Sequence, residues 1–221
     1  MKLFLNAAIK AVCGFVLVAL LIFLPAGTFN FANGWLLIGI LFIPMVLLGV
    51  ALLFKAPELL QKRLDTREME AAQQAVVAVS AIGFIGGFIT AGIDFRFGWS
   101  DVPDFAVIAA AVVFVFGYAM YAEVMRENAY LSRTVKVEHE QKVVDTGLYG
   151  IVRHPMYAAT LFMFLSMPIV LGSLYSFAVF LHYPIVIVVR IISEEKLLTE
   201  KLKGYKDYKK KVKYRLIPFV W

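Results

Sequence analysis

Long apolar stretches separated by short polar segments cover the first 125 residues of the chain. Four of these stretches are long enough to cross a bilayer as helices, since a membrane-spanning helix needs about 20 mainly apolar residues. They cover residues 11–27, 34–54, 75–93 and 105–125. This pattern predicts an N-terminal membrane scaffold of four spans, residues 1–125.

Two shorter apolar runs lie further along, at residues 156–171 and 174–192. Only Gly172 and Ser173 separate them, so the two runs are predicted to form a tight helical hairpin. Each run is close to the lower length limit for a membrane span. The whole pattern predicts an all-α, polytopic membrane helix bundle with about six crossings.

The polar segments are of several kinds. Residues 55–74 mix charged side chains with leucines, which fits a short surface helix or a solvated connector, and we prefer the connector. Residues 194–212 predict a basic amphipathic helix in the cytosol, and residues 215–221 predict an extended tail.

The connection between residues 126 and 155 is long and polar. Connections of about 30 residues are usually functional or disordered. Here the valines favour ordered, extended pieces; they are Val135, Val137, Val143 and Val144. We therefore expect this connection, the hairpin and the tail to form one C-terminal functional region, residues 126–221.

The distribution of charge predicts the orientation in the membrane. Lysines and arginines concentrate at the N-terminus and in residues 55–67, 126–153 and 196–215. The remaining linkers are short and acidic or uncharged. Because basic loops stay on the cytosolic side, six crossings place both termini in the cytosol.

Composition agrees with a membrane protein. Of the 221 residues, 61% are hydrophobic, whereas soluble domains are about 45–50% apolar. The net charge of +6 is explained by the basic loops, so we do not expect nucleic-acid binding. The single cysteine, Cys13, excludes an internal disulfide, and the spacing of the three histidines does not predict a metal site.

A basic segment marked by glycine and proline, residues 141–157, interrupts the apolar pattern directly before the hairpin. Its sequence, QKVVDTGLYGIVRHPMY, contains the pattern G-x-Y-x-x-x-R-H-P-x-Y. Further motif positions follow the two apolar runs or end them: Arg190, Glu194, Glu195, Tyr205, Tyr208, Ile217 and Pro218. A charged segment with defined backbone conformation at a membrane boundary indicates a binding site.

These motifs resemble the isoprenylcysteine carboxyl methyltransferase family of integral-membrane methyltransferases and the related phospholipid methyltransferases. The resemblance covers roughly the last 100 residues. It implies S-adenosylmethionine as the cofactor and Arg190 as the residue that holds the methyl acceptor. The implied cofactor contacts are Gln141, Lys142, Val143, Val144, Tyr149, His154, Pro155, Met156, Tyr157 and Glu194. The chain departs from the eukaryotic members at Gln141 and Lys142, where they carry a histidine and a hydroxyl residue.

The chemistry of these residue types is compatible with that cofactor. Pro155 suits the first turn of a helix, whose free N–H groups favour an anion such as the cofactor carboxylate, and His154 can pair with the same group. Glu194 can accept from a ribose hydroxyl or the amino group. Methylation of a carboxylate needs alignment rather than a general base, whereas an amine acceptor would need Glu194 or Glu195 as a base.

Other interpretations remain open. Arg190 and Glu194 are four residues apart and can form an ordinary helix pair, and Tyr149 and Tyr157 can be interfacial aromatics. We expect an S-adenosylmethionine-dependent methyltransferase that acts on a lipidic or lipidated acceptor, with a carboxylate preferred. The alternatives are a phospholipid N-methyltransferase, an NADPH-dependent membrane reductase of related fold, and a non-catalytic membrane protein.

Overall fold

The computed structural model describes residues 1–65, 71–131 and 141–221, without the side chains of residues 71–73. Within these residues all regular structure is helical. The helices are α1 (Lys2–Ala26), α2 (Ala32–Lys55), α3 (Pro57–Leu64), α4 (Ala71–Phe97), α5 (Asp104–Glu127), the 3₁₀ turn η1 (Gly147–Gly150), α6 (Pro155–Val170), α7 (Leu174–Phe180), α8 (His182–Lys201) and α9 (Tyr205–Lys211).

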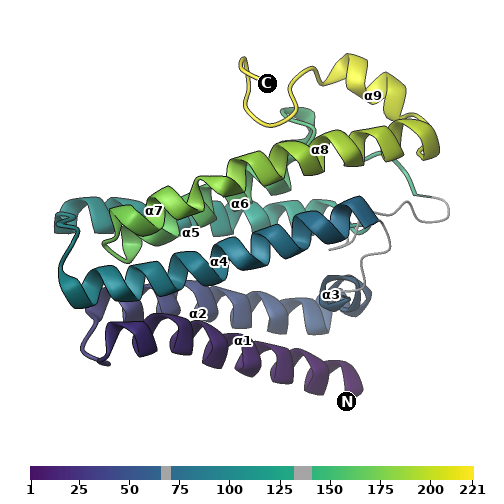
Figure 1. Ribbon diagram of the computed structural model, residues 1–221. Helices are drawn as coiled ribbons and strands as arrows, with labels where there is room; N and C mark the ends of the chain where they lie inside the picture. The colour runs from purple at the N-terminus through teal and green to yellow at the C-terminus, as the bar shows by residue number, and fades with distance from the viewer. Residues whose placement is uncertain (66–70, 132–140) are drawn as a thin grey trace.

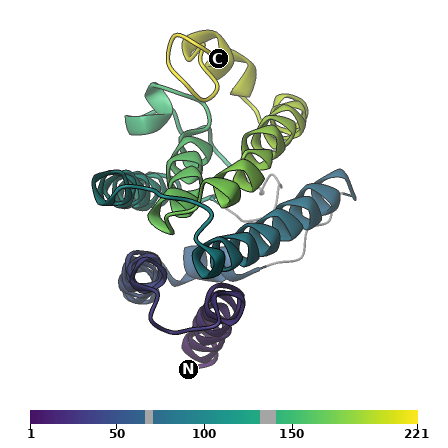
Figure 2. The same ribbon diagram turned by 60° about the vertical axis from the view of Figure 1, so that its left-hand side comes forward.

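The predicted membrane bundle is confirmed. Five helices of the described chain are long and apolar enough to cross a bilayer, namely α1, α2, α4, α5 and the combined α7–α8. A shorter apolar helix, α6, packs along α5 within the same bundle. Figure 1 shows the long helices running side by side, and Figure 2 shows α1 and α2 on one flank of α4, with α5 to α8 on the other.

The chain segments gather at the two ends of this bundle in an ordered way. The N-terminus, α3, the far end of α8 and α9 lie at the same end, which we call the α9 end (Figure 1). The short linkers after α1, α4 and α6 lie at the opposite end. The basic segments of the described chain therefore share one end, as the charge pattern predicts for one side of a membrane.

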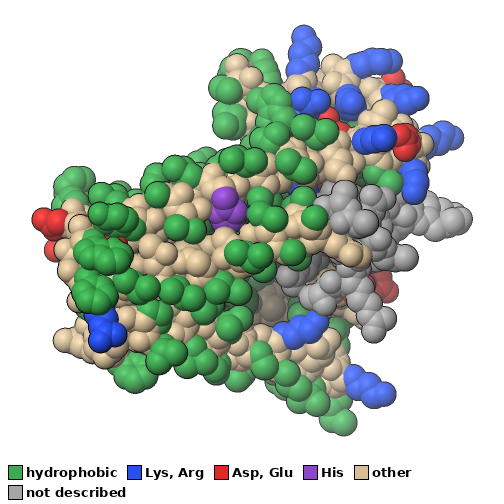
Figure 3. Space-filling model, in the orientation of Figure 1, with side chains coloured by type: hydrophobic (Ala, Val, Ile, Leu, Met, Phe, Trp, Pro, Cys, Tyr) green, Lys and Arg blue, Asp and Glu red, His purple; other side chains and the backbone are tan. Residues whose placement is uncertain are grey.

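Apolar side chains both fill and coat the bundle. Ile22, Leu37 and Phe114 are completely buried in the main core, while Ile82 and Val112 on the outer surface are 71% and 64% exposed. Figure 3 shows apolar side chains over the long helices, with lysine and arginine side chains near the α8–α9 end. Such a coat is stable in lipid, where apolar surface carries no cost.

The hairpin forms at the predicted place. The chain turns at Gly172, whose φ is 75°, and Ser173 caps the next helix by accepting from the Ser176 N–H at 3.0 Å. The second arm is interrupted at Leu181, between α7 and α8. Pro184 explains the interruption, since a proline cannot donate to the carbonyl four residues before it.

Three expectations about the polar segments are wrong. The segment at 57–64 is the helix α3 rather than a solvated connector, because Leu59 and Leu60 are buried against the bundle. The single helix predicted for residues 194–212 is broken between α8 and α9 at Gly204. The tail is folded back rather than extended, since the Trp221 carbonyl accepts three backbone N–H groups, those of Arg215, Leu216 and Ile217.

The structure describes only two of the four valines for which ordered, extended chain was predicted in the long connection. Val143 and Val144 lie among the described residues, in chain without regular secondary structure. Val135 and Val137 lie outside the described residues.

Candidate functional site

A pocket of about 840 Å³, including its open mouth, lies at the α9 end. Its walls come from residues 128–131 directly after α5, residues 141–144, η1, residues 153 and 154 with the start of α6, the second half of α8 with residue 202 after it, and α9. All ten positions that the sequence indicated as cofactor contacts line it: Gln141, Lys142, Val143, Val144, Tyr149, His154, Pro155, Met156, Tyr157 and Glu194. Arg190 lines it as well, whereas Glu195 does not.

The chain before α6 is held in place by the folded tail. The Arg153 N–H donates to the Tyr214 carbonyl and the His154 N–H donates to the Arg215 carbonyl, both at 2.9 Å. Pro155 then occupies the first helical position, where its missing N–H has no cost. The N–H groups of Tyr157 and Ala158 both donate to the His154 carbonyl, so these two amides are taken by the helix itself.

Glu195 is the centre of a buried ion network behind the pocket wall. Its side chain is 4% exposed and its Oε1 accepts from Arg153 Nε at 2.6 Å. His154 Nε2 lies 3.3 Å from the same oxygen, and Arg215 Nε donates to Oε2 at 2.9 Å. Arg153 also donates to the carbonyls of Val212 and Lys213, each at 2.7 Å. The network joins α8, the start of α6 and the tail.

Glu194, the neighbouring residue, faces the pocket instead. The Tyr157 hydroxyl donates to Glu194 Oε2 at 2.6 Å and accepts from Arg190 Nε at 2.9 Å. Tyr157 therefore bridges the arginine and the glutamate that share one face of α8. This series of hydrogen bonds places a cationic donor, a hydroxyl and a carboxylate acceptor along a single wall of the pocket.

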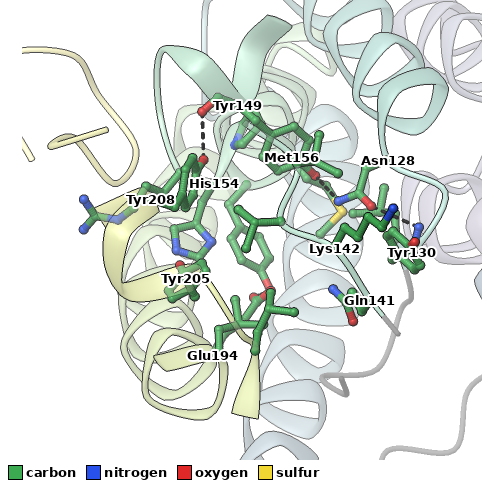
Figure 4. A pocket seen from close by; sticks show the side chains of 18 of the residues that line it. Asn128, Tyr130, Gln141, Lys142, Tyr149, His154, Met156, Glu194, Tyr205 and Tyr208 are labelled. Atoms are coloured by element: carbon green, nitrogen blue, oxygen red, sulfur yellow. Dashed lines mark hydrogen bonds between the residues drawn. The ribbon is translucent and has the colours of Figure 1, made fainter. Parts of the chain in front are cut away.

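Tyr149 closes another side of the pocket. Its hydroxyl accepts from Asn128 Nδ2 at 2.9 Å, and its carbonyl accepts from the Tyr208 hydroxyl at 2.7 Å, a bond drawn in Figure 4. Burial raises the pKa of the Tyr149 hydroxyl, so it stays neutral at physiological pH. The turn before it needs glycine, because Gly147 has a φ of 49° and the Glu127 carboxylate occupies the space of a side chain there.

The apolar part of the pocket comes from the loop and from α8 and α9. Val143 packs against the cluster of Leu202, Tyr205 and Tyr208, and Leu198 joins the same cluster. Figure 4 shows Tyr205 and Tyr208 across the pocket from Gln141 and Lys142. The pocket thus combines a polar wall with an apolar one, as a ligand with an aromatic ring and charged groups requires.

The sequence did not single out every lining residue. The lining residues that were not among the predicted contacts are Asn128, Tyr130, Leu131, Arg153, Leu198, Leu202, Tyr205 and Tyr208. Leu198 and Leu202 follow Glu194 at intervals of four, so helical periodicity could have found them. Among the described residues, no group of three or more His, Cys, Asp or Glu side chains is arranged to hold a metal ion.

A polytopic bundle of apolar helices defines an integral, multi-pass membrane protein, and this one carries a part-polar pocket at one end. Residues 105–205 match the family of phospholipid methyltransferases. The bundle as a whole is similar to a solved structure of the eukaryotic intramembrane Ras methyltransferase ICMT, an isoprenylcysteine carboxyl methyltransferase. The TM-score is 0.51 at 17% identity, over 98% of this chain and 85% of the other.

A second likeness is to a different enzyme. The chain is 31% identical over 91 residues to the Delta(14)-sterol reductase TM7SF2 of Mus musculus. The matched part is 40% of this chain but 22% of the length of the reductase. Taken with the fold and the matched segment, the resemblance to the integral-membrane methyltransferases is confirmed.

Proposed function

We propose that this protein is an S-adenosylmethionine-dependent methyltransferase that acts on a lipidic or lipidated acceptor. The observation that carries the proposal is the convergence of the ten indicated contact positions and Arg190 on one pocket at the end of a membrane bundle. These positions come from chain segments as far apart as residues 141 and 194. Their meeting is explained if they hold one ligand.

The residues of the pocket fit such a cofactor. The buried hydroxyl of Tyr205 has no partner among the described residues and can donate to a ligand. Glu194 can accept from a ribose hydroxyl or an ammonium group, and His154 can meet a carboxylate. When bound, S-adenosylmethionine supplies an activated methyl group on its sulfonium. The residues around it bind, orient and exclude water, which is the main help that an in-line displacement needs.

The acceptor would be held by Arg190. Its Nε donates to the Tyr157 hydroxyl at 2.9 Å, and a guanidinium is a planar cation whose fork of N–H donors suits a carboxylate. A carboxylate acceptor needs no proton removed, so O-methylation of an isoprenylcysteine-type acceptor is the reaction that we favour. Methylation of a phospholipid amine is the second candidate, with Glu194 as the base in the pocket.

A second hollow supports a lipidic acceptor. It has a volume of about 1290 Å³ including its open side and lies between α5, α6 and the tail around Leu216 and Pro218. Its lining is almost entirely apolar, and Pro155 belongs to both hollows. An acyl or prenyl chain can lie in this groove while its head group reaches the start of α6.

In this proposal Glu195 is a positioning residue rather than a catalytic base. Both of its oxygens are held by cationic side chains, and it does not line the pocket. We therefore assign it a positioning role, which is to fix Arg153, His154 and the tail behind the site. The division into a scaffold of residues 1–125 and a catalytic region of residues 126–221 is part of the same proposal, and so is the placement of both termini in the cytosol.

Ligand binding separates this function from the reductase alternative. The full chain in detergent is titrated calorimetrically with S-adenosylmethionine, S-adenosylhomocysteine and NADPH. We expect the first two to bind and NADPH not to bind. Transfer of a labelled methyl group from S-adenosylmethionine into a lipid extract then tests the reaction. Binding of NADPH alone would establish the reductase alternative, and binding of none of the three would favour a non-catalytic protein.

A further inference from the structure

Tyr205, the first residue of α9, carries a hydroxyl group for which residues 1–65, 71–131 and 141–221 offer no hydrogen-bond partner. The side chain is 3% exposed, and in the described parts of the chain no atom is within hydrogen-bonding distance of its Oη. Buried polar groups in folded proteins are almost always hydrogen-bonded, and one that is not carries a free-energy penalty. Such a hydroxyl in a pocket wall indicates a ligand that completes the bond.

The neighbouring tyrosines of the same pocket are satisfied by the protein itself. Tyr208 lies three residues further along α9 and donates to the Tyr149 carbonyl at 2.7 Å. The Tyr149 hydroxyl accepts from Asn128 at 2.9 Å. Tyr205 therefore differs from two residues of the same type in the same pocket, although all three are buried.

The position of Tyr205 is fixed by the turn between α8 and α9. Gly204 has a φ of 87°, a conformation that side chains with a Cβ rarely adopt, and this allows α9 to begin directly at Tyr205. At its far end, α9 is tied to the loop by Lys211, whose Nζ lies 2.7 Å from Asp145 Oδ2. Both features hold α9 close to the segment that carries Val143, which packs against the cluster containing Tyr205.

The surroundings of this hydroxyl indicate what kind of ligand group it meets. Val143, Leu198 and Leu202 pack around the Tyr205 side chain, while the charges of Glu195, Glu194 and Arg153 act on its hydroxyl. The side chains of Arg190 and Glu194 both contact the Tyr157 hydroxyl. A flat ring that carries a neutral hydrogen-bond acceptor fits here, because the ring can pack on these apolar side chains and the acceptor satisfies the hydroxyl without burying a further charge.

Electrostatics keep this hydroxyl a donor. Burial raises the pKa of Tyr205 above its ordinary value, and the negative charges of Glu195 and Glu194 raise it further. The group is therefore protonated throughout the physiological pH range.

We propose that Tyr205 is the purine-recognising residue of the pocket. Its hydroxyl donates a hydrogen bond to a ring nitrogen of the bound adenine, while Val143, Leu198 and Leu202 cover the ring. The assignment rests on the proposed S-adenosylmethionine function, and it names the group that selects an adenine nucleoside. The ribose and the amino acid part are left to Glu194 and His154, which line the same pocket.

Two tyrosine variants on the same helix test the assignment. Tyr205→Phe removes a hydroxyl that bonds none of the residues that the structure describes, so its thermal unfolding temperature in detergent should equal or exceed that of the parent. Its affinity for S-adenosylhomocysteine should fall about 5- to 30-fold, the effect of one lost hydrogen bond. Tyr208→Phe is the matched control and should lower the unfolding temperature, because its hydroxyl bonds the Tyr149 carbonyl.

Analogues of the ligand identify the group that is contacted. S-adenosylhomocysteine with a carbon in place of one ring nitrogen (the 1-deaza, 3-deaza and 7-deaza forms) is titrated into the parent and Tyr205→Phe. One analogue should bind the parent about 5- to 30-fold more weakly than the unmodified ligand. Tyr205→Phe should bind that analogue and the unmodified ligand with equal affinity.

The outcomes are distinct. The purine assignment is overturned if the parent binds S-adenosylhomocysteine and Tyr205→Phe binds it equally well, or if the parent does not discriminate among the analogues. It is also overturned if Tyr205→Phe retains the discrimination of the parent. If the parent binds neither S-adenosylmethionine nor S-adenosylhomocysteine, the proposed function itself fails and the purine assignment fails with it.

Discussion

Neutralising Glu195 should damage the fold far more than neutralising the adjacent Glu194. In the parent, the two Glu195 oxygens accept from Arg153 Nε at 2.6 Å and from Arg215 Nε at 2.9 Å. In Glu195→Gln, an NH₂ group replaces one of these oxygens. An NH₂ group is a donor, so it cannot accept from either arginine. The side chains of Arg153 and Glu195 are 6% and 4% exposed, so this pair is shielded from water. Removing one partner of a buried ion pair costs about 3–5 kcal/mol, because it leaves the other charge uncompensated.

The contact with Arg215 adds little to this figure. Its side chain is 34% exposed, and ion pairs that reach solvent contribute about 1 kcal/mol or less. The expected loss of unfolding free energy in Glu195→Gln is therefore set by the contact with Arg153. Arg153 also holds the tail, because it donates to the carbonyls of Val212 and Lys213. Loss of the carboxylate should release that tail as well as lower the stability of the fold.

Thermal unfolding in detergent and backbone hydrogen exchange measure both effects. Glu195→Gln should lower the unfolding temperature and speed the exchange of the Arg153, His154 and Arg215 amides. Glu194→Gln should leave both close to the parent, since Glu194 accepts from Tyr157 at the pocket wall. Equal stability of the two variants, with unchanged exchange in the tail, would refute the structural role given to Glu195.

Three further outcomes are expected. His154→Ala should weaken S-adenosylmethionine binding by about 1–3 kcal/mol, the range for a buried hydrogen bond, and unchanged affinity in a folded variant removes His154 from the site. Arg190→Gln should leave cofactor affinity nearly unchanged while lowering turnover, because the acceptor is no longer aligned; calorimetry and a methyl-transfer assay measure the two, and unchanged turnover refutes the role. With Cys13→Ala, a cysteine at Asp101 should react with an impermeant maleimide in intact cells and one at Lys209 should not; the reverse pattern overturns the orientation.

The apolar pattern predicted the bundle well, because composition alone decides which segments are stable in a bilayer. It placed the end of α4 four residues early, at residue 93, whereas the helix runs to Phe97. The reason is Asp94, a carboxylate that is 1% exposed. It accepts from Ser100 and from Ser173, which arrives from the distant hairpin turn. A buried charge that is satisfied by a residue 79 positions away has no local signal.

The two glutamates show the corresponding limit for the site. Consecutive residues on a helix point about 100° apart, so Glu194 and Glu195 cannot share a wall. The motif indicated both, but only the fold decides which one faces the pocket. Glu195 turns toward Arg153, and it also meets Arg215 of the tail. The folded tail itself depends on the Trp221 carbonyl, a backbone contact that side-chain patterns do not reveal.

The most direct test of the central claim is calorimetric titration of S-adenosylmethionine into the parent, Glu194→Gln and Glu200→Gln in the same detergent. Glu200 is an exposed residue of the same helix and does not line the pocket, so it controls for the loss of one negative charge. We predict saturable binding to the parent, equal binding to Glu200→Gln and clearly weaker binding to Glu194→Gln. Absence of binding to the parent, or equal binding to all three proteins, would contradict the assignment of this pocket as the cofactor site.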